Sequence, residues 1–373
     1  MKKLRTWILR GLRCAVILPA KLYRCFHPDL WLIGSRPDEA DGNALTLYHW
    51  IGNKRKCVFV LNKEAPQSRR GMIKWGGLKH MFYSAAAPMH VFDVEEIHFD
   101  IISPRMRKLF GLETKHIFLQ HGIIRLNIPL YHYSRKKYDL FVVSAKKEYE
   151  FVHSVFGYPY NHLALTGLAR YDQLIGKASD KRFVLIMPTW RRSLFKMNET
   201  EFMATAYYQR FQSLLNNKDF QAFLRENDLK LCFYLHYKIH DKQRLFSLPP
   251  DSLMYTATEQ VHELLRACSL LITDCSSVAF DVALAGKPLL YYGFEEEHYP
   301  PGDSYMQLDT DGFGPVVRDE QSILEYMNTI WDGQCFRRES IYDRRCDDFF
   351  TFRDTNNCQR IYDAIEAVQS RSS

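Results

Sequence analysis

Short apolar runs recur along this chain, and segments of helix length separate them. The runs are rich in Val, Ile, Leu and Phe without strict alternation with polar residues, which indicates strands buried on both faces. Such strands form parallel sheets that helices cover on each side, so the pattern predicts an α/β protein. The expected strands lie at 56–62, 96–101, 116–122, 139–144 and 162–167, and then at 182–190, 230–237, 251–256, 270–274 and 288–292.

The length of 373 residues suits two domains better than one. A polar segment, GKASDKR at 176–182, separates the two series of strands and is the expected linker. We therefore predict two doubly wound Rossmann-like domains that face a cleft, with ligands bound at the carboxyl ends of the strands. The predicted division is an amino-terminal segment at 1–30, domains at 31–176 and 181–345, and a helix and tail at 346–373.

The amino-terminal segment mixes basic and apolar residues over positions 1–26. Its charges interrupt any span of about 20 apolar residues, so it does not predict a transmembrane helix. A signal peptide is not expected either, because the uninterrupted apolar part is short and contains Pro19. Two interpretations remain, a basic amphipathic helix that lies on an anionic membrane surface and a helix that packs on a domain.

The composition narrows the class of ligand. Lys and Arg number 50 against 43 acidic residues, a formal charge of +7 that suits phosphorylated substrates or an anionic membrane surface. No nucleic-acid-binding motif accompanies this charge, so nucleic acid is not an expected partner. The nine cysteines include no CxxC pair and no zinc spacing, and neither a metal ion nor a cofactor is expected.

Groups suited to phosphate follow several of the predicted strands. A His-Gly pair, an arginine behind Pro-Thr-Trp, a second histidine and two adjacent serines each stand at a strand end. Each has an ordinary structural interpretation as a turn histidine, a surface arginine or a capping serine. Together they predict an anion site, since guanidinium groups, hydroxyls and helix N-termini bind oxyanions. These residues are His121, Gly122, Thr189, Arg191, His236, Ser276 and Ser277.

The combination of LQHGI (119–123), IMPTWR (186–191), FYLHY (233–237) and LLITDCSSVAF (270–280) resembles the CDP-glycerol glycerophosphotransferases, a family that includes teichoic acid primases and polymerases. The resemblance extends over roughly residues 30 to 345. It also includes WLIGSRPDEADGNA (31–44), WGGLKH (75–80), LTGLARYDQL (165–174) and GFGPVV (312–317). It implies a GT-B fold whose carboxyl-terminal domain binds the CDP-alcohol. It also favours the membrane-surface interpretation of the amino-terminal segment, at the cytoplasmic face.

The resemblance implies transfer of glycerol phosphate from CDP-glycerol to a hydroxyl of a cell-surface glycan or lipid-linked acceptor, with release of CMP. The expected general base is His121, with Gly122 leaving room for the acceptor. His236 is the second catalytic residue, and we expect it to position and stabilise the phosphates. Two loops supply the other donor contacts, which are Thr189 and Arg191 in one and Ser276 and Ser277 in the other. Tyr237 and Asp274 are expected to support these residues.

Departures from the family pattern leave the acceptor open. Family polymerases often have Trp before His-Gly and Thr-Pro after it, where this chain has Gln120 and Ile123-Ile124, and Cys275 replaces a frequent Tyr. Two alternative donors remain, CDP-ribitol and a nucleotide-sugar used by a GT-B glycosyltransferase. A non-catalytic scaffold is a third alternative, which the presence of both histidines disfavours.

Overall fold

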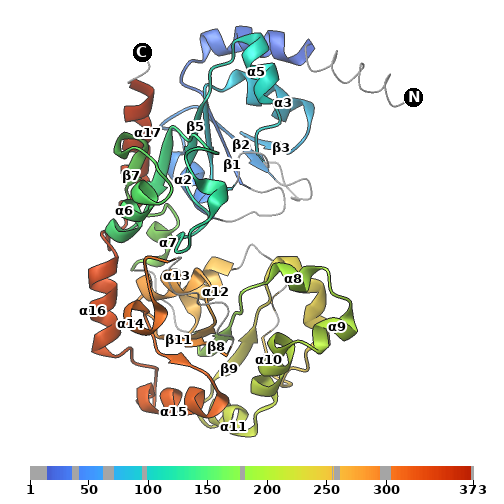
Figure 1. Cartoon of the computed structure of the whole chain (residues 1–373), viewed down its shortest axis with the longest axis vertical. Coiled ribbons are helices and arrows are strands. Elements are labelled where there is room, and N and C mark those ends of the chain that lie inside the picture. Colours follow the sequence, from blue (N-terminus) through green and yellow to red (C-terminus); the bar gives the residue numbers. More distant parts are fainter. Residues whose placement is uncertain are drawn as a thin grey trace. The chain divides into compact units, whose positions relative to one another are not determined.

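The computed structural model describes residues 15–35, 42–61, 71–94, 99–176, 181–253, 255, 261–294 and 304–370. The chain forms two compact units, each built on its own sheet (Figure 1). Unit 1 contains residues 1–123, 128–172 and 354–373, and unit 2 contains 124–127 and 173–353. The predicted linker at 176–182 lies partly outside the described residues.

Unit 1 contains a seven-stranded parallel sheet in the order β3-β2-β1-β4-β5-β6-β7. Val, Ile, Leu and Phe fill its central strands, which helices flank as the lack of alternation predicts. The strands are β1 (Trp31–Gly34), β2 (Cys57–Leu61), β3 (Met72–Lys74), β4 (Met89–Phe92), β5 (Lys115–Phe118), β6 (Leu140–Val143) and β7 (Leu163–Leu165).

The last helix of the chain, α17 (Asn357–Ser370), returns to unit 1 and lies beside α2 and β6 (Figure 1). The sequence alone did not assign this helix to either domain. The other helices of unit 1 are a helix over 15–26, α2 (Asn43–Ile51), α3 (Leu78–Ala86), α5 (Pro104–Phe110), η1 (Pro129–Tyr131), α6 (Lys146–Ser154) and η2 (Tyr160–His162). The short helix α7 (Tyr171–Leu174) spans the boundary between the units.

Unit 2 contains a five-stranded parallel sheet in the order β12-β11-β10-β8-β9. Its strands are β8 (Phe183–Ile186), β9 (Lys230–Phe233), β10 (Leu270–Thr273), β11 (Leu289–Tyr292) and β12 (Val316–Val317). The helices are α8 (Arg192–Phe195), α9 (Glu199–Met203), α10 (Ala206–Asn216), α11 (Lys218–Glu226), η3 (Tyr237–Leu245), α12 (Val261–Ala267), α13 (Val278–Leu284), α14 (Leu308–Asp311), α15 (Glu320–Ile330) and α16 (Ser340–Phe349).

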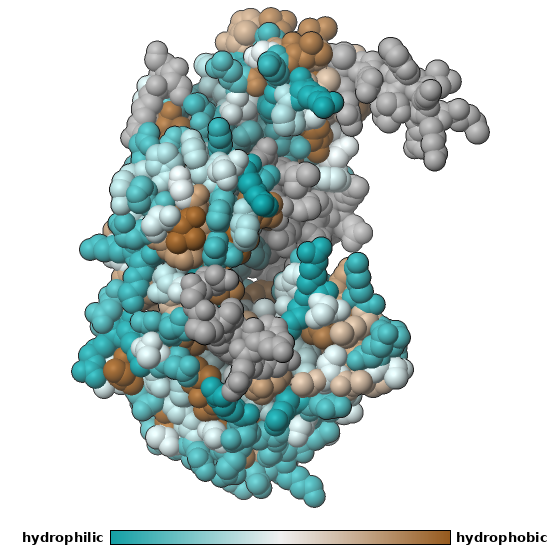
Figure 2. Space-filling model, in the orientation of Figure 1, coloured by the Kyte–Doolittle hydropathy of each residue, from teal (hydrophilic) through white to brown (hydrophobic). Residues whose placement is uncertain are grey.

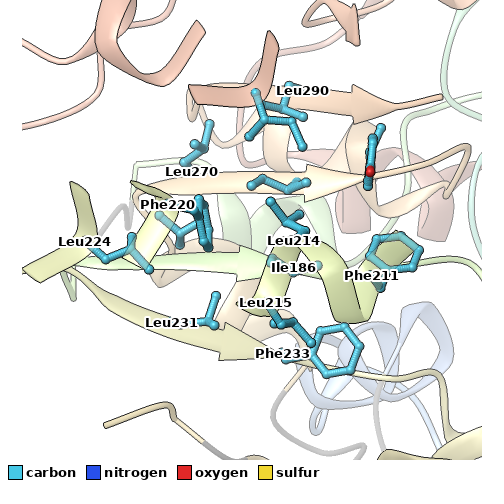
Figure 3. Close-up of a cluster of buried hydrophobic side chains, with 14 of the residues drawn as sticks. Ile186, Phe211, Leu214, Leu215, Phe220, Leu224, Leu231, Phe233, Leu270 and Leu290 are labelled. Atoms are coloured by element: carbon cyan, nitrogen blue, oxygen red, sulfur yellow. The ribbon is translucent and has the colours of Figure 1, made fainter. Parts of the chain in front are cut away.

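A hydrophobic core holds this sheet in place (Figure 3). Phe211 and Leu214 of α10 and Phe220 of α11 are fully buried against the strands. Ile186 and Leu290, from β8 and β11, point into the same cluster. Because the strands cannot shift within such a packed core, the loops at their carboxyl ends hold fixed positions relative to one another.

Most predicted strands are present, but the one expected at 96–101 is not formed in its described part. The strand beside β1 is β4, and residues 99–101 are not extended in the sheet, while residues 96–98 lie outside the described residues. Phe99 is fully buried in the core. Its ring packs so closely on Gly34 that a Cβ added to this glycine would lie 2.5 Å from the ring. The run at 251–256 contributes an isolated bridge between Leu253 and Cys232 in its described part. Apolar sequence alone does not separate a core side chain from a strand.

The helix over 15–26 carries apolar residues on two faces, one packed against the protein and one exposed to solvent. Ile17 and Ala20 are fully buried, whereas Leu18, Leu22 and Phe26 are 60, 63 and 72% exposed. Figure 2 shows brown apolar surface at the end of unit 1 where this helix lies. The described residues include no helix that is both long and apolar enough to span a bilayer.

Candidate active site

The loops after β8 and β10 meet at the carboxyl edge of the unit 2 sheet. The backbone N–H of Thr189 donates a 2.9 Å hydrogen bond to Asp274 Oδ1, and the Thr189 hydroxyl donates to the same oxygen. Arg191 Nη1 lies 2.7 Å from Asp274 Oδ2, and both side chains are less than a tenth exposed. Arg191 also donates to the Thr189 carbonyl. Asp274 therefore fixes both residues, and Arg191 is a buried arginine, in contrast to the surface-loop interpretation.

The loop after β9 joins this group through an aromatic contact. The rings of Trp190 and His236 stack with centroids 5.6 Å apart, and Lys238 Nζ lies 4.0 Å from the Trp190 ring centroid. His236 Nδ1 accepts a 3.3 Å hydrogen bond from the Lys238 N–H. An accepting Nδ1 places the proton of the neutral ring on Nε2. His236 is thus oriented as a hydrogen-bond donor through Nε2.

Ser276 and Ser277 stand where β10 passes into α13, and both are half-buried. Ser276 Oγ accepts a 3.4 Å contact from the Val278 N–H, and Ser277 makes no capping hydrogen bond with its side chain. Ser277 has helical backbone angles, φ −65° and ψ −14°, whereas a capping serine requires extended ones. The interpretation as a capping serine therefore does not hold for Ser277.

Cys275 lies between these groups, with its sulfur 3.9 Å from the Thr189 hydroxyl. Burial and the Asp274 carboxylate raise the pKa of this thiol to about 11, against the opposing charges of Arg191 and Arg125. The thiol therefore stays protonated at neutral pH, and only the thiolate is a strong nucleophile. This arrangement does not support a covalent intermediate on Cys275.

His121 stands at the carboxyl edge of the unit 1 sheet, beyond β5. Its side chain is exposed, while its carbonyl accepts a hydrogen bond from Arg170. The preceding Gln120 is fully buried at φ +61°, a conformation that costs a non-glycine residue about 1–2 kcal/mol. Asn43 Nδ2 donates to the Gln120 carbonyl at 2.7 Å, and Gln120 Nε2 donates to the Val142 carbonyl at 2.6 Å. These contacts hold the turn that presents the histidine.

The family model for CDP-Glycerol:Poly(glycerophosphate) glycerophosphotransferase matches residues 27–367. The chain belongs to this family. The match confirms the resemblance inferred from the sequence motifs.

The names of curated relatives of this chain refer to teichoic acid biosynthesis. The minor teichoic acid biosynthesis protein GgaB of Bacillus subtilis (strain 168) is 30% identical over 368 residues, which cover 90% of this chain and 39% of GgaB. The teichoic acid poly(glycerol phosphate) polymerase of Staphylococcus epidermidis is 22% identical over 350 residues, covering 86% of this chain and 43% of that protein. The chain thus spans about two-fifths of the length of these relatives.

A solved structure of the wall teichoic acid polymerase TagF has a TM-score of 0.73 to this chain at 15% identity. The alignment covers 100% of this chain and 97% of the TagF chain. The likeness confirms the predicted GT-B-like fold class.

One group of side chains in unit 1 has the geometry of a metal site. Potential ligand atoms of His90, Asp100 and His116 lie within 4.8 Å of one another. However, Asp100 already forms a 2.7 Å ion pair with Arg107, whose Nε also donates to it at 2.8 Å. The Arg107 guanidinium already supplies a positive charge to the Asp100 carboxylate, so the residues of the cluster give no reason to infer a metal ion.

The structure brings the predicted donor residues of unit 2 to one sheet edge. Hydrogen bonds, an ion pair and an aromatic stack link the loops after β8, β9 and β10 through Asp274 and Trp190. His121 and Gly122 belong to unit 1. Sequence reasoning missed Trp190, although its place between Thr189 and Arg191 was a signal, and it missed Arg125, which no strand-end pattern marks.

Proposed function

We propose that the chain transfers glycerol phosphate from CDP-glycerol to a hydroxyl of a cell-surface glycan or lipid-linked acceptor and releases CMP. The observation that carries the proposal is the cluster at the carboxyl edge of the unit 2 sheet, where Thr189, Arg191 and His236 lie around Asp274 and Trp190. Membership of the glycerophosphotransferase family supports this choice of donor. A TagF variant structure soaked with CDPG adds a related protein with that ligand.

In the proposed reaction the acceptor oxygen bonds to the β-phosphorus, and the bond from that phosphorus to the oxygen bridging to CMP breaks. An alcohol needs a base to accept its proton, and His121 is the proposed base because its ring is exposed on a turn fixed by Asn43 and Arg170. Gly122 leaves space on the acceptor side. The proton of the acceptor hydroxyl moves to the His121 ring.

The donor residues stabilise charge on the phosphates. His236 donates from Nε2, because its Nδ1 is engaged by the Lys238 N–H. Arg191, which is paired with Asp274, brings a positive guanidinium to the site, and Ser276 and Ser277 add hydroxyl donors. Thr189 contributes a further hydroxyl beside them. Positioning and charge compensation of this kind are the main requirements of phosphoryl transfer.

Membrane association at the cytoplasmic face is the second part of the proposal. The helix over 15–26 buries Ile17 and Ala20 and exposes Leu18, Leu22 and Phe26 at intervals of four residues. Leu109 of α5, a helix whose Phe110 carbonyl accepts from Lys21 Nζ at 2.8 Å, is 73% exposed. An exposed apolar stripe on a surface helix suits insertion into the headgroup region of a bilayer. The basic residues before position 15 lie outside the described residues.

The test of the chemistry is CMP release with a panel of donors, namely CDP-glycerol, CDP-ribitol, and UDP- and GDP-sugars. Acceptor-dependent CMP release from CDP-glycerol is the expected result. Turnover of CDP-ribitol alone would correct the polyol, and turnover of a nucleotide-sugar alone would make the chain a glycosyltransferase. No turnover or binding of any donor would favour a scaffold.

A further inference from the structure

Arg125 comes from a short segment that packs apart from its neighbours in sequence. Residues 124–127 belong to unit 2, whereas the segments before and after them belong to unit 1. Leu126 forms an isolated antiparallel bridge with Ser304 of unit 2. The four-residue segment is thus part of the unit that contains the candidate donor site, although only Ile123 separates it from the His121-Gly122 pair.

The environment of Arg125 places it at the carboxyl ends of β10 and β11. Its side chain is buried, with 9% of the residue exposed. Its positive charge acts on Cys275 and on Tyr291, where it opposes the burial that raises the pKa of both groups. Cys275 follows β10, Tyr291 belongs to β11, and the two strands pair in parallel with Thr273 opposite Tyr291. Arg125 is therefore a neighbour of the Thr189, Cys275 and Asp274 group.

Among the residues that the structure describes, the charges of this group do not balance. Asp274 is neutralised by Arg191 at 2.7 Å, and in the described part of the chain no carboxylate forms an ion pair with Arg125. A buried guanidinium without an anion is costly, because it has lost solvation by water and gained no compensating charge. A phosphate or diphosphate would supply that charge, and its oxygens match the planar guanidinium fork.

We propose that Arg125 is a second phosphate-binding arginine of the donor site and contacts the diphosphate of CDP-glycerol together with Arg191. This inference rests on the proposed function and adds a residue to its donor site. Arg191 reaches the site from the β8 loop, and Arg125 reaches it from the side of β10 and β11. Two guanidinium groups against one carboxylate leave a net positive charge of one for the diphosphate.

The experiment measures CDP affinity by calorimetry on the full chain, with cytidine as a competitor that carries no phosphate. Arg125→Gln should weaken CDP binding by about 10- to 100-fold, as expected for a charged hydrogen bond, and leave the cytidine inhibition constant unchanged. Arg125→Lys keeps the positive charge without the planar guanidinium fork, so its CDP affinity should lie between those of the wild type and of Arg125→Gln. Arg182→Gln is the matched control, because Arg182 precedes β8 at the opposite edge of the sheet and bonds the Asn227 carbonyl at 2.6 Å.

Wild-type CDP affinity in a folded Arg125→Gln variant would overturn the inference, and so would an equal loss of CDP and cytidine binding. If thermal melts show that the glutamine variant does not fold, Arg125→Lys decides: unchanged CDP affinity there overturns the inference. Failure of the proposed function has a different signature, since the wild-type chain would then neither bind CDP nor release CMP from CDP-glycerol. In that case the inference falls with it.

Discussion

Asp274 determines how much positive charge Arg191 can offer to a substrate. The two side chains form a buried ion pair at 2.7 Å, and Asp274 also receives two hydrogen bonds from Thr189. Removing one partner of a buried pair leaves an uncompensated charge, which costs about 3–5 kcal/mol. The stability role and the donor role of Arg191 must therefore be separated by experiment.

We predict that Arg191→Ala destabilises the protein by that amount and weakens CDP-glycerol binding. The double variant Arg191→Met with Asp274→Asn removes both charges, and Asn keeps an acceptor for the Thr189 N–H. It should recover most of the stability in urea denaturation, while its calorimetric donor affinity stays weaker than wild type by about 1.5–3 kcal/mol. Wild-type donor affinity in the double variant would leave Arg191 with a structural role alone.

The two histidines should respond differently to substitution. His121→Ala removes the proposed base and should lower turnover by about 10²–10⁴-fold, with CDP-glycerol affinity close to wild type. His236→Ala should impair both turnover and affinity, because His236 stacks on Trp190 in the same loop as Arg191. Transfer rates and calorimetry on variants with checked thermal melts provide the comparison. Normal turnover of His121→Ala would contradict the assignment of the base.

At the scale of elements, unit 1 buries two histidines that resist protonation, His80 of α3 and His90 of β4. Burial lowers the pKa of His80 to about 4, although Asp100 acts in the opposite direction, and burial lowers the pKa of His90 well below its usual range. Burial acts to raise the pKa of Asp100, but its interactions with His90, His116 and Arg107 outweigh burial and hold this pKa below its usual range. His80 and His90 are therefore neutral in the fold and take up protons when the chain unfolds at acidic pH.

We predict that unit 1 loses stability as the pH falls from about 6.5 to 4. A group whose folded pKa is lowered binds more protons in the unfolded state, so the free energy of unfolding decreases below the unfolded pKa. The His80 shift corresponds to about 3 kcal/mol at full effect. His80→Asn keeps an acceptor for the Gly76 N–H, which bonds His80 Nδ1 at 2.9 Å. Urea denaturation across this range should show a smaller pH dependence in that variant, and an equal dependence would refute the assignment.

The return of α17 to unit 1 depends on Asp172. Its carboxylate accepts hydrogen bonds from the N–H and side chain of Asn357 at 2.9 and 2.7 Å and from the Cys358 N–H at 2.8 Å. We predict that Asp172→Ala lowers the free energy of unfolding by about 1–3 kcal/mol, since it leaves the first turn of α17 without acceptors. Asp363→Ala, on the exposed side of α17, is the control. Equal melting temperatures for the two variants would argue against this role.

The sequence patterns predicted the secondary-structure elements and the strand ends better than they predicted contacts between residues far apart in the chain. Runs such as 139–144 and 270–274 are buried on both faces, so composition alone indicated β6 and β10. The return of α17 and the bond from Asn43 to Gln120 join residues far apart in the chain, which no local pattern encodes. The proposed donor residues could be selected from the sequence because each follows a predicted strand. Arg125 was missed because it belongs to unit 2 through tertiary packing alone.

At the scale of the whole molecule, deletion is a poor test of membrane association. Removing residues 1–26 would also uncover the surface that Ile17 and Ala20 cover, because both are fully buried on unit 1. A chain with an exposed core adheres to many surfaces, so its binding to vesicles would say little about the native protein. Substitutions on the exposed side of the helix leave the packed side intact.

We predict that the triple variant Leu18→Ser, Leu22→Ser and Phe26→Ser loses most of its binding to anionic vesicles in flotation. These side chains are 60 to 72% exposed, so their replacement should leave the melting temperature unchanged. The control replaces exposed apolar residues of unit 2, with Phe195→Ser and Ile341→Ser, at 58 and 40% exposure. Each apolar side chain that enters the bilayer interface contributes through the area it buries, so three losses should weaken binding by at least tenfold. Equal flotation of the triple variant and the control would place the membrane contact elsewhere on the chain.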